Sequence, residues 1–159
     1  MIPVPGTGGH ETVVYAAQVG ASGVVLLELG EGLGEDLWHA FVCTVLRRLG
    51  GRPLWAVPPL VLTARGSGQR VIGEVMGCRI GAPDPPAERV LLARLETVRG
   101  QTWPAGFGES PGRSDALLRS WEDEVNGSPL PGLGQTSREL FERLDRKRLR
   151  PLHPGRASE

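Results

Sequence analysis

The sequence predicts an α+β fold built on a four-stranded, mostly antiparallel sheet. Two pairs of segments rich in β-branched and apolar residues are each followed by an amphipathic helical pattern, which gives the order ββαββα. Two short C-terminal helices follow. This order is consistent with a circularly permuted ferredoxin-like sheet. We expect one sheet face to carry both long helices and the other to be open, or covered by the C-terminal helices or by a second subunit.

The first pair of strands spans residues 12–19 and 24–29. The first is rich in β-branched and aromatic residues, and the second is an apolar run. The short turn at 20–23 contains two glycines, so we expect a β-hairpin.

The first helix is predicted at residues 35–49. Acidic residues open it and two arginines close it, as the helix dipole favours, and Gly50 supplies the stop. Its expected apolar stripe comprises Leu37, Phe41, Val42, Val45, Leu46 and Leu49.

The second pair of strands is predicted within residues 54–63 and 70–80, around a turn at 66–68. Pro58 and Pro59 interrupt the first of them, so we expect an edge strand or a strand that starts after the prolines. The turn predicts a second hairpin.

The second long helix is predicted to run from Asp84 to about Arg99, with Asp84 as the N-cap and Pro85 at the first helical position. Its expected buried stripe comprises Val90, Leu91, Leu95 and Val98.

The chain beyond residue 100 is turn-rich and predicts two smaller helices, at 114–125 and, after a linker, from the capping-box sequence Thr136 to Glu139 onward. We therefore divide the chain into a flexible arm at 1–11, an α+β core domain at 12–100, a helical C-terminal extension at 101–150 and a disordered tail at 151–159.

Composition excludes several classes of function. The formal net charge is zero, so no global field steers the chain to nucleic acid or to an anionic membrane. The two cysteines, Cys43 and Cys78, lie in apolar stretches and make no disulfide framework. Without a leader pattern or an apolar run of about 18 residues, we expect no membrane association and a cytoplasmic location.

A glycine motif follows the second strand. Glu28 and Leu29 precede Gly30, Gly32 and Gly34, and a helix begins directly afterward. Residues 27–34 resemble motif I of S-adenosylmethionine-dependent methyltransferases. The resemblance implies that the three glycines line a nucleotide-like cofactor and that Glu28 lies beside it.

The rest of the chain departs from that family's pattern. The end of the next predicted strand, at 56–59, has no carboxylate to hold ribose hydroxyls, and no further strands follow residue 80. A flexible turn between a strand and a helix is the alternative interpretation, and we expect no cofactor.

Metal and catalytic patterns are weak. His39 and Cys43 share a helix face and could join His10 and Cys78 as zinc ligands, but no compact ligand pair is present. No Gly-x-Ser-x-Gly elbow occurs either. We expect neither a metal site nor catalytic residues.

Two features remain as candidates for binding. A basic cluster near the C-terminus could contact nucleic-acid phosphates, although acidic residues interleave with it. It comprises Arg143, Arg146, Lys147, Arg148 and Arg150.

Apolar residues of the C-terminal extension could anchor a protein interface or instead fix its helices to the sheet. They are Leu117, Phe141 and two of the four tryptophans, Trp103 and Trp121. We predict a non-enzymatic interaction module, adaptor or chaperone-like, that binds a protein partner and itself as a homodimer. A small-ligand binder using the glycine motif and a nucleic-acid binder using the basic helix are the alternatives.

Overall fold

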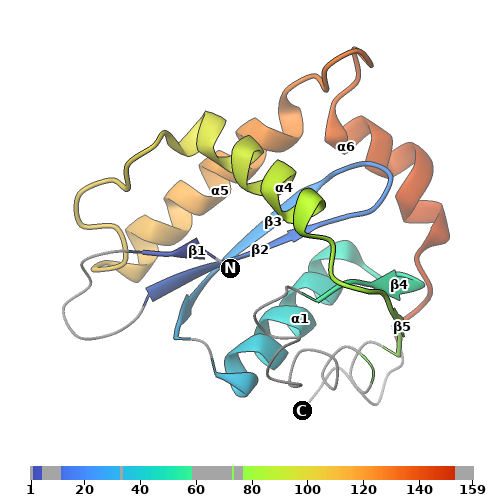
Figure 1. The fold of residues 1–159 in the computed structure, drawn as a ribbon, viewed down its shortest axis with the longest axis horizontal. Helices are drawn as coiled ribbons and strands as arrows, with labels where there is room; N and C mark the ends of the chain where they lie inside the picture. Colours follow the sequence, from blue (N-terminus) through green and yellow to red (C-terminus); the bar gives the residue numbers. More distant parts are fainter. Residues whose placement is uncertain (1, 5–11, 33, 59–72, 74–76, 153–159) are drawn as a thin grey trace.

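The computed structural model describes residues 2–4, 12–32, 34–58, 73 and 77–152. An antiparallel sheet forms the centre, in the order β1-β2-β3, with helices on both of its faces (Figure 1). Its strands are β1 (Ile2–Pro3), β2 (Thr12–Gln18) and β3 (Val25–Glu31). The α+β class is confirmed.

The second pair of strands differs from the prediction. Within the described residues, β4 (Trp55–Ala56) and β5 (Arg79–Ile80) form a separate two-stranded sheet, and they pair in parallel. A single four-stranded sheet is therefore not present in this part of the chain. These described ends do not pair as the predicted second hairpin requires, because a tight turn joins only antiparallel strands. Its turn at 66–68 lies outside the described residues.

The first hairpin is confirmed. β2 and β3 are antiparallel in a register that runs from Thr12 opposite Glu31 to Gln18 opposite Val25. The sequence predicts that the second strand ends at Leu29, but β3 continues through Gly30 to Glu31. The first glycine of the motif therefore belongs to the sheet rather than to the turn.

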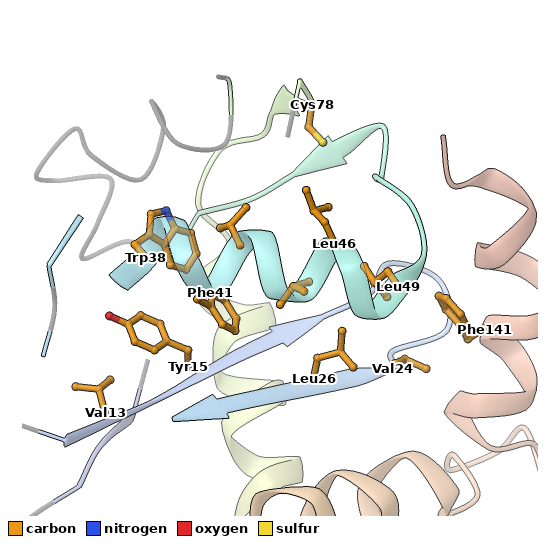
Figure 2. Close-up of a cluster of buried hydrophobic side chains, with 12 residues drawn as sticks. Val13, Tyr15, Val24, Leu26, Trp38, Phe41, Leu46, Leu49, Cys78 and Phe141 are labelled. Carbon is orange, nitrogen blue, oxygen red and sulfur yellow. The ribbon is translucent and has the colours of Figure 1, made fainter. Parts of the chain in front are cut away.

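Helix α1 (Glu35–Leu49) confirms the first predicted helix, and it ends at Gly50, whose φ is 72°. Its apolar stripe packs on one face of the sheet (Figure 2). There the ring of Tyr15 lies 5.1 Å from that of Phe41, and Phe41 lies 5.4 Å from Trp38, measured between centroids. This cluster fixes α1 to β2.

The opposite face is covered by α4 (Pro85–Arg99) and α5 (Pro111–Gly127). The prediction that both long helices share one face is wrong. Val13 and Val14, consecutive in β2, are 1% and 2% exposed, so both faces of the strand are buried and both need a covering layer. Of the predicted C-terminal helices, α5 covers this face together with α4, whereas Phe141 of the last one packs on the α1 face.

Helix α4 begins where the sequence predicts, with the Asp84 carboxylate accepting the Ala87 N–H at 3.0 Å. Its stripe is narrower than predicted. Leu95 is buried, and Leu91 and Val98 pack on the same core, but Val90 is 56% exposed. Leu91, Leu95 and Val98 form the i, i+4, i+7 series that faces the sheet. Val90 does not belong to this series, so its side chain faces solvent.

The final helix is shorter than predicted. Its capping box is confirmed in α6 (Ser137–Leu140), but a π-helical turn at Phe141–Asp145 and a 3₁₀ turn at Arg146–Arg148 replace the rest of the helix. The Asp145 carboxylate accepts the Ser22 N–H at 2.8 Å. This contact ties the C-terminal segment to the tip of the first hairpin.

The two ends of the chain are described in part. Within the predicted arm, Ile2–Pro3 forms β1 and Val4 is buried. The rest of that arm, residues 5–11, and most of the predicted tail, 153–159, lie outside the described residues. None of the described helices is long and apolar enough to cross a bilayer.

Candidate functional site

Gly30 gives space to a side chain of the core. It lies opposite Val13 in the β2–β3 ladder, and a Cβ atom placed on it would lie 2.4 Å from Cε2 of Tyr15. The Tyr15 hydroxyl donates to the Gly32 carbonyl at 2.8 Å. Two glycines of the motif therefore have structural roles that need no ligand.

Gly32 and Gly34 carry the chain from β3 into α1. Gly32 has a φ of 97°, which disfavours any side chain. Gly34 is the N-cap of α1, with an extended backbone. Binding of a small ligand by this segment stays the alternative hypothesis.

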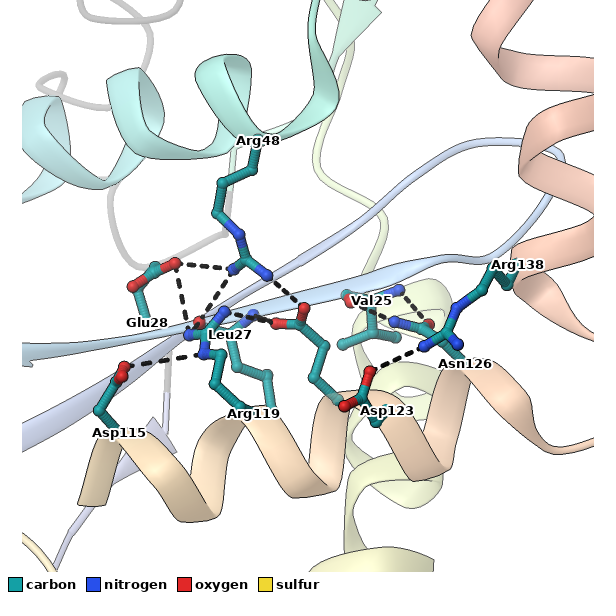
Figure 3. A network of polar contacts seen from close by, with 10 residues as sticks. Val25, Leu27, Glu28, Arg48, Asp115, Arg119, Asp123, Asn126 and Arg138 are labelled. Carbon is teal, nitrogen blue, oxygen red and sulfur yellow. Dashed lines mark hydrogen bonds and ion pairs between the residues drawn. The ribbon is translucent and has the colours of Figure 1, made fainter. Parts of the chain in front are cut away.

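Glu28 lies on β3, between helix α1 on one face of the sheet and helix α5 on the other. Its carboxylate pairs with Arg48 of α1 at 2.7 Å and with Arg119 of α5 at 3.4 Å (Figure 3). Arg119 also lies 3.7 Å from the Asp115 carboxylate. This carboxylate, predicted to lie beside a cofactor, is thus held in an ion-pair network that joins both helical layers.

Helix α5 completes the hydrogen bonding of the outer edge of β3. The Asn126 amide pairs with both backbone groups of Val25, and the Glu122 carboxylate accepts the Leu27 N–H at 2.9 Å (Figure 3). Arg48 and Arg119 both donate to the Leu27 carbonyl. Sequence reasoning missed this contact. The sequence signal for it is that Glu122 and Asn126, four residues apart, directly follow Trp121 and Val125 of the apolar stripe. This spacing places both polar side chains on one side of the helix, next to its apolar stripe.

The residues predicted as interface anchors lie within the molecule's own core. Trp121 and Phe141 are buried, and Leu117 packs against the same core as Trp121. Trp103 lies 4.9 Å from Phe107 between ring centroids, and the Arg99 guanidinium lies 4.4 Å from the Trp103 centroid. These contacts fix the C-terminal extension to the sheet.

A cavity of about 380 Å³ opens beside these aromatic rings. Its lining residues are Val4, Gln101, Thr102, Trp103, Pro104, Ala105, Gly106, Phe107 and Glu109. Because Trp103 and Phe107 already pack on each other and on Arg99 and Trp121, their ring faces are largely occupied.

The residues of the predicted basic cluster differ in whether their side chains have partners. Arg146 pairs with Glu142 at 2.6 Å, and Arg143 donates to the Gln135 side chain at 2.9 Å. Lys147, Arg148 and Arg150 are exposed, and the described residues offer them no ion pair. The backbone of Arg150 pairs with that of Arg52, with an N–H to O distance of 2.9 Å in each direction.

An apolar surface is exposed at the small parallel sheet. Trp55 and Val57 are 54% and 51% exposed, and Leu54 and Ile80 adjoin them at 39% each. Because Ala56 packs on the core and neighbouring residues in a strand face opposite ways, Trp55 and Val57 face away from the core. Leu54, two residues before Ala56, and Ile80, which pairs with Ala56, lie on the other face of these strands. We call Trp55 and Val57 the β4–β5 patch.

Metal and thiol chemistry find little support in the described residues. No group of three or more His, Cys, Asp and Glu side chains there could hold a metal ion. The Cys43 sulfur lies 4.0 Å from Nδ1 of His39. Burial raises the pKa of Cys43 against a smaller, opposing effect of Arg47.

Comparison with known proteins gives no identity. No protein-family model matches the chain, and no curated protein matches it either.

Proposed function

We propose that this chain is a non-enzymatic protein-interaction module, adaptor or chaperone-like, whose partner docks on the β4–β5 patch. The observation that carries the proposal is the pair of half-exposed apolar side chains, Trp55 and Val57, on the outward face of β4 and the residue after it. Adjacent exposed apolar side chains are typical of interaction sites, and tryptophan is enriched among the residues that dominate binding energy.

The location of the patch supports the same proposal. It lies outside both hydrophobic cores, so the fold does not need Trp55 or Val57 to be apolar. Trp121 and Phe141, by contrast, are needed inside the molecule. We therefore assign the docking surface to the small sheet rather than to Trp121 and Phe141.

We also propose that the module is a homodimer. Its net charge of zero means that two copies have no overall charge repulsion. Native mass spectrometry tests this directly, since a dimer has twice the mass of the 17.0 kDa chain. A spectrum of monomer alone would contradict it without affecting the docking proposal.

Selection from a random peptide library tests the docking surface. The immobilised chain is expected to enrich peptides that bind in solution, and the Trp55→Ser, Val57→Ser double variant is expected to enrich none. Val90→Ser is the matched control, because Val90 is an equally exposed apolar residue on α4. The proposal fails if the wild type enriches no peptide, or if the double variant binds the peptides as well as the wild type does.

A further inference from the structure

Three arginines from distant parts of the sequence meet beside the β4–β5 patch. Arg79 lies in β5 opposite Trp55, with its guanidinium 5.6 Å from the centroid of the Trp55 ring. Arg52 follows α1, and Arg150 follows the last 3₁₀ turn. The last two are joined by their paired backbone hydrogen bonds.

The segment around Cys78 shows that these side chains converge. Arg52 donates to the Gly77 carbonyl at 3.2 Å, immediately before Cys78. Burial raises the pKa of the Cys78 thiol, and the positive charges of Arg52 and Arg150 oppose that shift. Arg52 therefore lies beside Gly77, and Arg150 is held next to Arg52 by the paired backbone hydrogen bonds. Cys78 and Arg79 follow Gly77 directly in the chain.

Two of these arginines, Arg79 and Arg150, have no partner among the carboxylates that the structure describes. Both are exposed. Elsewhere the exposed arginines Arg138 and Arg146 pair with Asp123 and Glu142 at 2.8 and 2.6 Å. The patch thus combines an apolar surface with cations that lack a described counter-charge.

We infer that the partner of the β4–β5 patch is a peptide segment carrying apolar and acidic side chains. Its apolar residues pack on Trp55 and Val57, and its carboxylates bind Arg79 and Arg150. Arginine suits this role because its planar guanidinium can bind a carboxylate through two parallel hydrogen bonds. This inference rests on the proposed function and specifies the chemistry of the same site.

Charge and side-chain type argue against two other occupants. In a two-fold contact the same surface meets itself, so a second copy would bring Arg79 and Arg150 toward their own equivalents. Single-stranded nucleic acid would use several aromatic rings as stacking platforms. The patch offers one such ring, Trp55, beside the aliphatic side chain of Val57.

The test uses a peptide from the library selection in three versions. The acidic residues are kept, replaced by their amides, or replaced by lysine, and a single-stranded DNA oligonucleotide is the fourth probe. The full chain is titrated with each probe at low and high ionic strength. We expect the acidic version to bind most tightly, and its affinity to fall with salt.

Charge-reversal variants connect the preference to the arginines. Arg79→Glu and Arg150→Glu are each expected to weaken the acidic peptide about fivefold or more, as for a modest ion pair. Arg113→Glu is the control, because it makes the same charge change at an exposed position of α5. Circular dichroism and the urea midpoint check that each variant is folded.

The outcomes separate this inference from the proposed function. Equal binding of all three peptide versions, with no effect of either reversal, overturns the acidic partner and leaves the docking surface in place. Tighter binding of the oligonucleotide than of the acidic peptide overturns it in favour of nucleic acid. Failure of every peptide to bind overturns both proposals.

Discussion

The side-chain amide of Asn126 pairs with the backbone of Val25 as a neighbouring strand would. Its Oδ1 accepts the Val25 N–H, and its Nδ2 donates to the Val25 carbonyl, each at 2.7 Å. Edge strands with unpaired backbone groups readily pair with other chains. Helix α5 therefore closes this part of the β3 edge.

Replacement of Asn126 by alanine is expected to lower the free energy of unfolding by about 2–4 kcal/mol, since it leaves two buried backbone groups of Val25 without partners. Urea denaturation measures the loss. Glu124→Ala, an exposed change two residues earlier in the helix, should have little effect. A loss as small as that of the control would show that the pair contributes nothing to stability.

Replacement of Gly30 by alanine is expected to destabilise the fold by about 1–3 kcal/mol, because the new methyl group would overlap the Tyr15 ring. Thermal or urea unfolding provides the measurement. Gly112→Ala is the matched control, since nothing lies within 4 Å of a Cβ atom at that position of α5. Equal stability of the two variants would contradict the packing role of Gly30.

Glu122 should respond differently to alanine and to glutamine. Alanine leaves the Leu27 N–H, Arg48 and Arg119 without this acceptor, so we expect a loss of about 3–5 kcal/mol. Glutamine keeps a carbonyl oxygen for Leu27 and should cost less.

The neighbouring Asp123 is the control for this pair of variants. Asp123→Ala removes an exposed ion pair with Arg138 and should cost about 1 kcal/mol or less. If Glu122→Ala proved as mild as Asp123→Ala in urea denaturation, the edge contact would not be a significant source of stability.

The capping box gives a prediction about pH. The Thr136 backbone N–H, and next its hydroxyl group, lower the pKa of the Glu139 carboxyl below its ordinary 4.5. A carboxyl whose pKa is lowered in the folded state stabilises the fold when the pH is above the pKa of that carboxyl in the unfolded chain. That contribution is lost as the pH falls through the folded pKa.

Carbon-detected NMR titration of Glu139 measures this effect. Thr136→Ala removes the hydroxyl but keeps the backbone N–H, so the pKa should rise part of the way toward its ordinary value. An identical pKa in the variant and the wild type would rule out a contribution of the hydroxyl.

The two cysteines are expected to react slowly in the folded protein. Burial raises the pKa of Cys43 and of Cys78 above 9.0, so few thiolates form at pH near 8, and the sulfur atoms are shielded. Thiol titration with a disulfide reagent should be slow in buffer and fast in urea. Cys43→Ser and Cys78→Ser variants assign each phase, and rapid reaction in buffer would contradict the burial.

Local features of the fold could be predicted from the sequence. The N-cap at Asp84, the capping box at Thr136 and the αL glycine at Gly50 are each formed within a few residues of chain. The first hairpin is equally local, because a short turn joins two apolar strands. In these places residue type and spacing were sufficient.

The candidate site could not be predicted in the same way. The glycine motif was interpreted through its spacing, but the constraint on Gly30 comes from Tyr15 in the paired strand. The sequence does not distinguish Trp55 from the other tryptophans, because its exposure depends on how the small sheet packs. Composition also gave no sign that Arg52, Arg79 and Arg150 would meet.

The sequence by itself determined the α+β class, the first hairpin, the helix boundaries set by caps and the absence of a dominant charge. Tertiary structure decided which faces the helices cover, how the edge of β3 is completed and which apolar side chains are exposed. The physical reason is distance along the chain. Asn126 and Val25 are 101 residues apart, and such contacts depend on packing of both sheet faces rather than on local propensity.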